Sequence, residues 1–251
     1  MVSAADRVRN PARNSVWLEG KTPRTRKADQ PAGLDRDRIT EVSVRLLDAE
    51  GLAKFSMRRL AAELNVTAMS VYWYVDTKDD LLELALDSVF SEITPPADTG
   101  DWRDRLRALA TSYRELLVRH VWVSPLIGTF LNIGPHSLAF SRAVQDVMRA
   151  TGLPPHGQMG GLSAVFQFVY GFGTIEGHFV QRCASAGMSQ DEFFAQAMGT
   201  MSTAPQLRET FESAKDLMEA RGGDTVAEMR ERDFQFALET LIAGIEVMTA
   251  R

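Results

Sequence analysis

The chain has 251 residues, of which 45% are apolar and 24% charged, and its formal net charge is −5. This composition excludes a wholly disordered chain and supports a sizeable globular core. A single cysteine, Cys183, excludes an internal disulfide and any multi-cysteine metal site, and suits a reducing cytoplasm. No apolar run follows the basic N-terminus, so no secretory signal is expected.

Charge is unevenly distributed along the chain. Residues 1–33 hold seven Lys or Arg against three Asp or Glu, whereas 34–92 hold seven against twelve and 93–251 hold fourteen against eighteen. Prolines and the lack of apolar periodicity in 1–33 predict a basic, largely flexible arm, in which only SVWL (Ser15 to Leu18) could dock on a surface. A basic arm therefore precedes an acidic body.

Regular structure is expected from Leu34 onwards. Apolar residues at positions 39, 42, 46 and 47 form one helical stripe, which ends at Gly51. Ser56 then offers an N-cap for a second helix over 57–64. The pattern predicts two short helices at the start of the body.

A tight turn and two further helices follow. Asn65 tolerates the left-handed conformation that ends a helix, and Thr67 can cap a short helix through about Tyr74. Thr77 and Asp80 have the spacing of a capping box for a long helix over about 78–93. This order of elements fits a helix-turn-helix.

The stretch PPADTG at 95–100 marks a boundary, beyond which only helical patterns occur. We therefore expect an all-α protein with an arm (1–33), a helix-turn-helix domain (34–93) and a C-terminal helical domain (101–251). The low-charge segment 161–180 is nearly long enough to span a bilayer, but its polar residues and glycines favour a buried helix over a membrane span. The expected helices of the last domain cover 101–119, 123–132, 135–152, 157–185, 189–200, 205–219 and 225–250.

Two of these helices are candidates for a homodimer interface. In 225–250, Phe234, Leu238, Leu241, Ile245 and Met248 recur at spacings of 4, 3, 4 and 3 residues. The helix 157–185 is apolar nearly all round and needs partners on several sides. Internal core is the alternative for any single residue, but a dimer through both helices is expected.

The stretch ITEVSVRLLDAEGLAKFSMRRLAAELNVTAMSVYWYVDTKDDLLELALD, residues 39–87, resembles the DNA-binding domain of the tetracycline-repressor (TetR) family without gaps. The YW pair and the C-terminal segment FQFALETLIAGIE resemble the tetracycline-repressor class within it. The resemblance implies an all-helical homodimer with an N-terminal helix-turn-helix domain and a C-terminal ligand-binding and dimerisation domain. It further implies a repressor that binds a palindromic, double-stranded DNA operator and leaves it when a small effector binds.

The same resemblance assigns DNA-contacting residues. Arg58 resembles the family's arginine that reaches a base edge, and Lys78 is placed for a phosphate. Ala68 and Met69 depart from the polar base-reading residues of relatives, because apolar side chains offer no hydrogen-bond code. The full expected set on the body is Ser56, Arg58, Thr67, Ala68, Met69, Ser70, Tyr72, Trp73, Tyr74 and Lys78.

The basic arm can supply the DNA contacts that Ala68 and Met69 do not offer. Arg24, Arg26 and Lys27 lie just before the first helix, placed as in proteins whose N-terminal arms enter the adjacent minor groove. A disordered, solubilising tail is the alternative.

A surplus of aromatic and methionine side chains in the C-terminal half fits either ordinary core or an apolar pocket for a flat, natural-product effector. The resemblance also implies a magnesium–drug ligand histidine just before a GT step, but SPLIGTF has Leu126 and Ile127 there, so neither a metal nor a cofactor is expected. The expected effector residues are Trp122, Phe130, Met159, Phe166, Gln167, Tyr170 and His178.

An enzyme is the other function class. GLSAV at 161–165 lacks the second glycine and the preceding strand of a serine elbow, and Glu176 and His178 face different directions on a helix. We therefore expect no catalysis. An architectural or constitutive DNA-binding protein without an effector, and less so a helical enzyme, remain alternatives to a ligand-responsive repressor.

Overall fold

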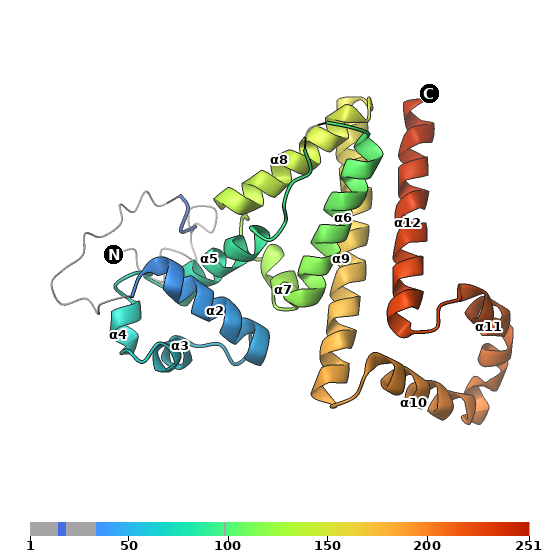
Figure 1. Cartoon of the computed structure of the whole chain (residues 1–251), viewed down its shortest axis with the longest axis horizontal. Helices are drawn as coiled ribbons and strands as arrows, with labels where there is room; N and C mark the ends of the chain where they lie inside the picture. Colours follow the sequence, from blue (N-terminus) through green and yellow to red (C-terminus); the bar gives the residue numbers. More distant parts are fainter. Residues whose placement is uncertain (1–14, 19–33, 98, 251) are drawn as a thin grey trace.

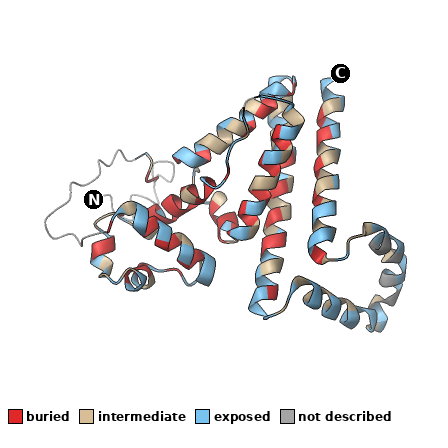
Figure 2. Cartoon of the chain, viewed as in Figure 1, coloured by how far each residue is buried: buried red, intermediate tan, exposed pale blue. Residues whose placement is uncertain are grey.

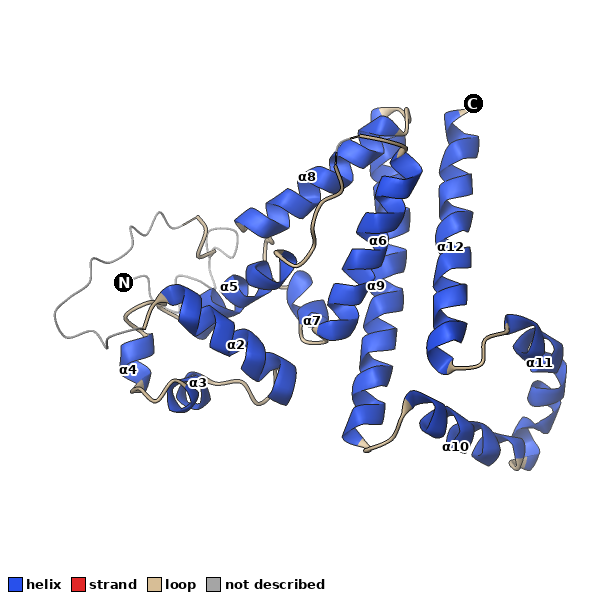
Figure 3. Ribbon diagram, viewed as in Figure 1, coloured by secondary structure: helices blue, strands red, loops and turns tan. Residues whose placement is uncertain are grey.

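The computed structural model describes residues 15–18, 34–97 and 99–250, and within these ranges it consists of helices and connecting loops without strands (Figures 1 and 3). The expected all-α class is confirmed. The helices are α2 (Arg36–Glu50), α3 (Met57–Glu63), α4 (Ala68–Val71), α5 (Lys78–Phe90), α6 (Trp102–Arg119), α7 (Val123–Ile127), α8 (Pro135–Ala150), α9 (Pro155–Ser185), α10 (Gln190–Ser202), the 3₁₀ turn η2 (Pro205–Leu207), α11 (Arg208–Arg221) and α12 (Val226–Thr249).

Local hydrogen bonds fix the helix starts in the N-terminal part. The hydroxyls of Ser56 and Thr67 accept the backbone N–H groups of Arg59 and Ser70, each at 3.2 Å. Thr77 and Asp80 form the expected capping box. These three caps agree with the sequence prediction, because a side-chain oxygen at the N-cap satisfies an otherwise unpaired backbone donor.

Several helix ends differ from the predictions. Asn65 has the expected positive φ of 54°, but α4 ends at Val71 rather than near Tyr74. The segment expected to be helical over 123–132 ends at Ile127, and Asn132 has a φ of 52°. In both places a short helix gives way to a turn, which apolar spacing alone does not reveal.

Helix α5 joins the N-terminal helices to the C-terminal ones and is buried on nearly every side (Figure 2). It packs along α2 on one side and against α8 on the other. Its buried residues include three acids, Asp80, Glu83 and Asp87, which are costly inside a core unless they are hydrogen-bonded. Asp80 belongs to the capping box, and the other two have partners from distant parts of the chain.

The segment Ser15–Leu18 is docked on α5 through Glu83. The Ser15 hydroxyl donates to Glu83 Oε2 at 2.6 Å, and the Val16 N–H donates to the same oxygen at 3.2 Å. Burial raises the pKa of Glu83, although these two hydrogen bonds oppose the shift. The expectation that SVWL could dock on a surface is therefore met, and Val16 joins the core.

Asp87 holds the start of α8. Its carboxylate accepts the N–H of Ser137 at 2.8 Å and the N–H of His136 at 3.3 Å, so it caps a helix that begins 48 residues later in the chain, at Pro135. A Cβ atom at Gly134 would overlap this carboxylate, so only glycine allows the close approach. Helices α5 and α8 are therefore linked by a buried, charge-assisted cap.

Helices α6 and α9 form the closest helix pair of the C-terminal part. A Cβ atom at Gly177 would lie 3.0 Å from the Leu117 carbonyl oxygen, and one at Gly173 would lie 3.1 Å from the Leu117 Cβ. The two glycines therefore bring the helix backbones together. No helix in the described part combines the length and apolarity that a membrane crossing requires.

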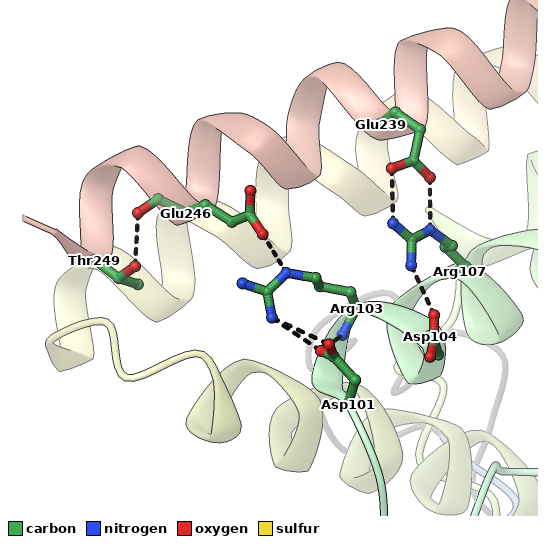
Figure 4. Close-up of polar contacts among 7 residues, drawn as sticks. All are labelled: Asp101, Arg103, Asp104, Arg107, Glu239, Glu246 and Thr249. Atoms are coloured by element: carbon green, nitrogen blue, oxygen red, sulfur yellow. Dashed lines mark hydrogen bonds and ion pairs between the residues drawn. The ribbon is translucent and has the colours of Figure 1, made fainter.

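Helix α12 returns alongside α9 after the excursion made by α10 and α11 (Figure 1). Arginines on α6 pair with carboxylates on α12, among them Arg107 with Glu239 at 2.6 and 2.7 Å, and Arg103 with Glu246 (Figure 4). Of the expected 4-3-4-3 stripe on α12, Phe234, Leu238 and Ile245 are buried within the chain, as the internal-core alternative predicts, whereas Met248 is exposed. A straight α-helix has about 3.6 residues per turn, so a stripe spaced at about 3.5 residues drifts around its surface. Beside Leu241, the buried residue is therefore Ile242.

His120 connects α2 to the end of α5 and the end of α6. Its Nδ1 lies 2.7 Å from Asp48 and its Nε2 lies 3.0 Å from Glu92, while the Trp122 indole N–H donates to Asp48 at 2.6 Å. Arg119 also pairs with Glu92. Burial opposes a charge on the ring, but the hydrogen bonds and charges of Asp48 and Glu92 outweigh it and raise the pKa of His120 above its ordinary 6.5.

This arrangement predicts a loss of stability at alkaline pH. Because the folded-state pKa lies above the unfolded one, the stabilisation is complete below about pH 6.5 and is lost as the pH rises through the folded value. Urea unfolding of the wild type at pH 6 and pH 9 should show this loss, and His120→Gln should reduce it. His178→Gln, at an exposed position, is the control. Equal pH dependence in the wild type and His120→Gln would contradict the charged-histidine assignment.

Candidate DNA-binding surface and effector site

Helices α3 and α4 and the turn between them form a helix-turn-helix. Val71 and Val75 are buried, whereas Met69 on α4 is 66% exposed and Tyr72 just after it is also exposed. Arg58 near the start of α3 is exposed as well. The outer face of α4 and the start of α3 therefore present apolar, aromatic and cationic groups, which are the groups that contact thymine methyls, phosphates and guanine.

Besides the helix caps Ser56 and Thr67, three of the expected DNA-contacting side chains already have partners within the protein. Ser70 is buried, and its hydroxyl lies 3.0 Å from that of Thr67. The Tyr74 hydroxyl donates to the Leu34 carbonyl at 2.7 Å. The Lys78 ammonium donates to a backbone carbonyl at 2.8 Å, that of Phe55. These contacts give Ser70, Tyr74 and Lys78 roles in holding the domain together.

The other expected DNA-contacting residues remain accessible. Ser56, Arg58, Thr67, Met69 and Tyr72 are exposed. Ala68 and Trp73 are half-buried. The arm residues Arg24, Arg26 and Lys27 lie outside the described residues.

Four aromatic rings from four helices meet inside the C-terminal part. Phe90 of α5 lies 6.2 Å from Tyr113 of α6 and 5.6 Å from Phe140 of α8, measured between ring centroids. Phe166 of α9 lies 5.6 Å from Phe140 and 6.1 Å from Tyr113. We call Phe90, Tyr113, Phe140 and Phe166 the aromatic cluster.

The aromatic cluster contains one polar group, the hydroxyl of Tyr113. Burial raises the pKa of this phenol, so it stays protonated and can donate a hydrogen bond. The side chain is almost fully buried and makes no hydrogen bond within the described part of the chain. An unpaired donor among apolar rings is a natural handle for the oxygen of an aromatic molecule.

Only part of the expected effector set lies at this cluster. Phe166 belongs to it, and Tyr170 is one turn further along α9, where its hydroxyl donates to the Ser124 carbonyl at 2.9 Å. Phe130 is half-buried after α7, in contact with the core. Trp122 is buried elsewhere, where it bonds to Asp48 of α2.

The remaining three expected effector residues lie on the exposed side of α9. Met159, Gln167 and His178 are all exposed, and they do not converge with the aromatic cluster within one chain. The sequence indicated aromatic and polar groups on one helix but not which side of it faces inwards. Phe90, Tyr113 and Phe140 were not in the expected set; their positions on the apolar stripes of α5, α6 and α8 were the available signal.

Comparison with known families agrees with this arrangement of a helix-turn-helix ahead of a helical domain. Residues 39–85 match the family described as "Bacterial regulatory proteins, tetR family", and residues 94–249 match "Tetracyclin repressor-like, C-terminal domain". The chain therefore belongs to the TetR family of transcriptional regulators, and it is not an enzyme.

Curated relatives and solved structures support the same assignment. A protein of Saccharopolyspora erythraea named HTH-type transcriptional regulator is 37% identical over 66% of this chain and 69% of its own length. The HTH-type transcriptional repressor DrrR1 of Streptomyces coeruleorubidus is 30% identical over 94% of this chain and 85% of its own length. Apo ActR from Streptomyces coelicolor superposes with a TM-score of 0.69, at 25% identity over 88% of this chain and 98% of that one. ActR has also been solved in complex with actinorhodin; that structure gives a TM-score of 0.66 at 26% identity over 88% of this chain and 100% of that one.

Proposed function

We propose that this regulator is a ligand-responsive repressor. As a homodimer it binds a palindromic operator, and a small aromatic effector releases it. The observation that carries the proposal is the position of α5, which contributes Phe90 to the aromatic cluster and packs along α2 of the helix-turn-helix domain. An effector at the aromatic cluster and the helix-turn-helix domain, through α2, would therefore act on the same buried helix.

The rings of the aromatic cluster are in contact, so an effector would have to separate them. Separation would displace Phe90 and with it the end of α5, while the carboxylate of Asp87 transmits movement between α5 and α8. The effector must bind the displaced state better by about 1–3 kcal/mol to give a useful response. ActR, solved with actinorhodin, is the relative that supports an effector of this chemical kind.

The homodimer is supported by exposed apolar residues on α9 and α12. Ile175 of α9 is 70% exposed and Phe236 of α12 is 79% exposed, and Val247 and Met248 are also exposed. Exposed apolar side chains mark a protein–protein interface when they lie together in one patch. A symmetric pairing of these two helices would cover them and place two reading heads for two half-sites.

Tyr72 provides a direct test of the reading head. Tyr72→Phe keeps the ring and removes one exposed hydroxyl, so operator affinity should fall by about 3- to 10-fold, the usual worth of one hydrogen bond. Tyr74→Phe is the matched control, because its hydroxyl serves Leu34 and its loss should lower stability, not DNA affinity. Fluorescence anisotropy with labelled operator measures both. Equal affinities of Tyr72→Phe and the wild type would remove the phosphate role of that hydroxyl.

The basic arm needs a test that leaves its docked segment intact, because Ser15 and Val16 bond to Glu83. Replacing Arg24, Arg26 and Lys27 together by alanine should weaken operator binding and flatten its salt dependence by up to about three counterions. Titrations at several salt concentrations give the slope. An unchanged slope would favour a solubilising tail over an arm that enters the minor groove.

Release of DNA by an effector tests the function as a whole. Operator duplex would be selected from a random-sequence pool with the full chain and then challenged with actinorhodin and with a panel of other polycyclic aromatic compounds. We expect at least one of them to release the duplex, and Phe140→Ala to shift the concentration needed. Retention of DNA against the whole panel would favour the constitutive DNA-binding alternative.

A further inference from the structure

A second groove lies outside the aromatic cluster, between the helix-turn-helix domain and the C-terminal part. It has a volume of about 430 Å³ and is bounded by α2, by α5, by the start of α8 and by Trp17 of the docked N-terminal segment. This volume is within the range of small-molecule sites. The groove shares no lining residue with the aromatic cluster, so the two are separate places in the fold.

The lining of the groove combines apolar and aromatic surface. Val44 of α2 and Leu84 and Val89 of α5 supply aliphatic walls, and the indole of Trp17 supplies a flat one. Trp17 is held in place by its neighbours, since Ser15 and Val16 are hydrogen-bonded to Glu83. A preformed flat wall beside aliphatic ones favours a flat aromatic occupant.

The groove also contains a donor without an acceptor. The Nε atom of Arg36 is enclosed by protein, yet it has no hydrogen-bond partner in the described part of the chain. Because Nε is closed to water, a ligand in the groove would meet the other guanidinium N–H groups of Arg36, which lines the groove and has no ion pair within the described part of the chain. The ligand atom that accepts a hydrogen bond from Arg36 would be an oxygen.

The other charged groups define which kind of oxygen fits. Four carboxylates line the groove, those of Asp37, Glu41, Asp87 and Glu92, against two arginines, Arg36 and Arg45. Three of the carboxylates are already paired: Glu41 with Arg38, Asp87 with the start of α8, and Glu92 with Arg119 and His120. The acidic excess disfavours an anionic ligand and leaves a neutral carbonyl oxygen as the acceptor for Arg36.

We propose that this groove is a second small-molecule site, which binds a neutral, flat aromatic compound with a carbonyl oxygen directed at Arg36. The aromatic rings lie against Trp17, and the aliphatic walls of α2 and α5 cover their edges. A ligand there touches α2, α5 and α8 together, and therefore bridges the DNA-reading domain and the C-terminal domain. The site does not depend on the repressor function, because its occupancy can be measured without DNA.

The test is a calorimetric titration of the full chain with 1,8-dihydroxyanthraquinone, a neutral flat compound with carbonyl oxygens. Arg36→Met keeps the aliphatic stem and removes the donor, and Trp17→Leu removes the flat wall. Arg142→Met, an exposed arginine on α8, is the matched charge control, and Phe140→Leu reports on the aromatic cluster. Anthraquinone-2-carboxylate tests the preference for a neutral ligand.

We expect Arg36→Met and Trp17→Leu to weaken one binding step by at least tenfold, with that step unchanged in Arg142→Met and Phe140→Leu. We also expect the carboxylate compound to bind this step more weakly than the neutral one. No binding to the wild type up to the solubility limit, wild-type affinity in Arg36→Met, or a loss that appears only in Phe140→Leu would each overturn the proposal. Because Arg36→Met leaves the hydrogen bonds of Ser15 and Val16 to Glu83 in place, it decides the case even if Trp17→Leu loosens the docked segment.

Discussion

Phe236→Glu is expected to convert the protein into a monomer that binds its operator at least about 100-fold more weakly, since linking two reading heads raises affinity by about 10²–10⁴ over one. Phe236 is 79% exposed on α12, and Ile175 on the neighbouring α9 is 70% exposed. A carboxylate in the middle of an apolar interface would be buried without a partner. The folded chain itself should be unaffected, because the side chain has little contact with it.

Leu217→Glu is the matched control, because Leu217 is 76% exposed but lies on α11, away from the proposed interface. Sedimentation velocity gives the oligomeric state of each variant, and anisotropy gives the operator affinity. The control should remain dimeric and bind normally. A dimeric Phe236→Glu variant with unchanged affinity would show that α12 does not carry the interface.

Arg114→Met is expected to lower the free energy of unfolding by about 3–5 kcal/mol, the cost of leaving a buried charge without its partner. The Arg114 side chain is only 8% exposed and donates to both oxygens of Glu176 at 2.7 and 3.0 Å and to Glu231 at 2.6 Å. It also lies over the rings of Phe172 and Phe234. One side chain of α6 therefore holds both α9 and α12.

Arg103→Met is the control within the same pair of helices. Arg103 pairs with Glu246 on α12, but its side chain is 34% exposed, so water screens the interaction and the loss should be far smaller (Figure 4). Urea denaturation of both variants gives the comparison. Similar losses for the two would mean that burial of the Arg114 network adds nothing.

Local features of the fold could be predicted from the sequence. The caps at Ser56, Thr67 and Thr77 and the turn at Asn65 depend on residues within four positions, so short patterns suffice to find them. The proposed DNA-reading face rests on the resemblance at 39–87. The expected outward direction of Tyr72 agrees with its exposure in the structure.

Long-range contacts could not be predicted in the same way. His120 bonds to Asp48, 72 residues earlier, and Asp87 caps a helix that begins at Pro135. Helical spacing predicts that a helix exists but not which neighbour covers each side, and this is why Met159 was expected in the effector site although it is exposed. The acids Glu83 and Asp87 within the apolar run of α5 were a usable signal, because such acids require distant partners.

In the proposed mechanism of release, the buried helix α5 transmits movement through three contacts. Glu83 ties it to the docked N-terminal segment, Asp87 to α8, and Phe90 to the aromatic cluster. In the proposed mechanism, a ligand that moved one of these contacts would change the position of α2 against the rest of the chain. The second groove lies beside two of these contacts, so its occupant would act on α5 as well.

The central claim of the repressor proposal is that two chains bind one operator. The stoichiometry of the complex with a selected operator duplex tests this claim directly. Sedimentation equilibrium of the full chain on that duplex should give two chains per site, on half-sites about one helical turn apart. Addition of a releasing effector should return free duplex and an intact dimer. A single chain on the duplex, or no preference for the selected sequence over random DNA, would contradict the proposal.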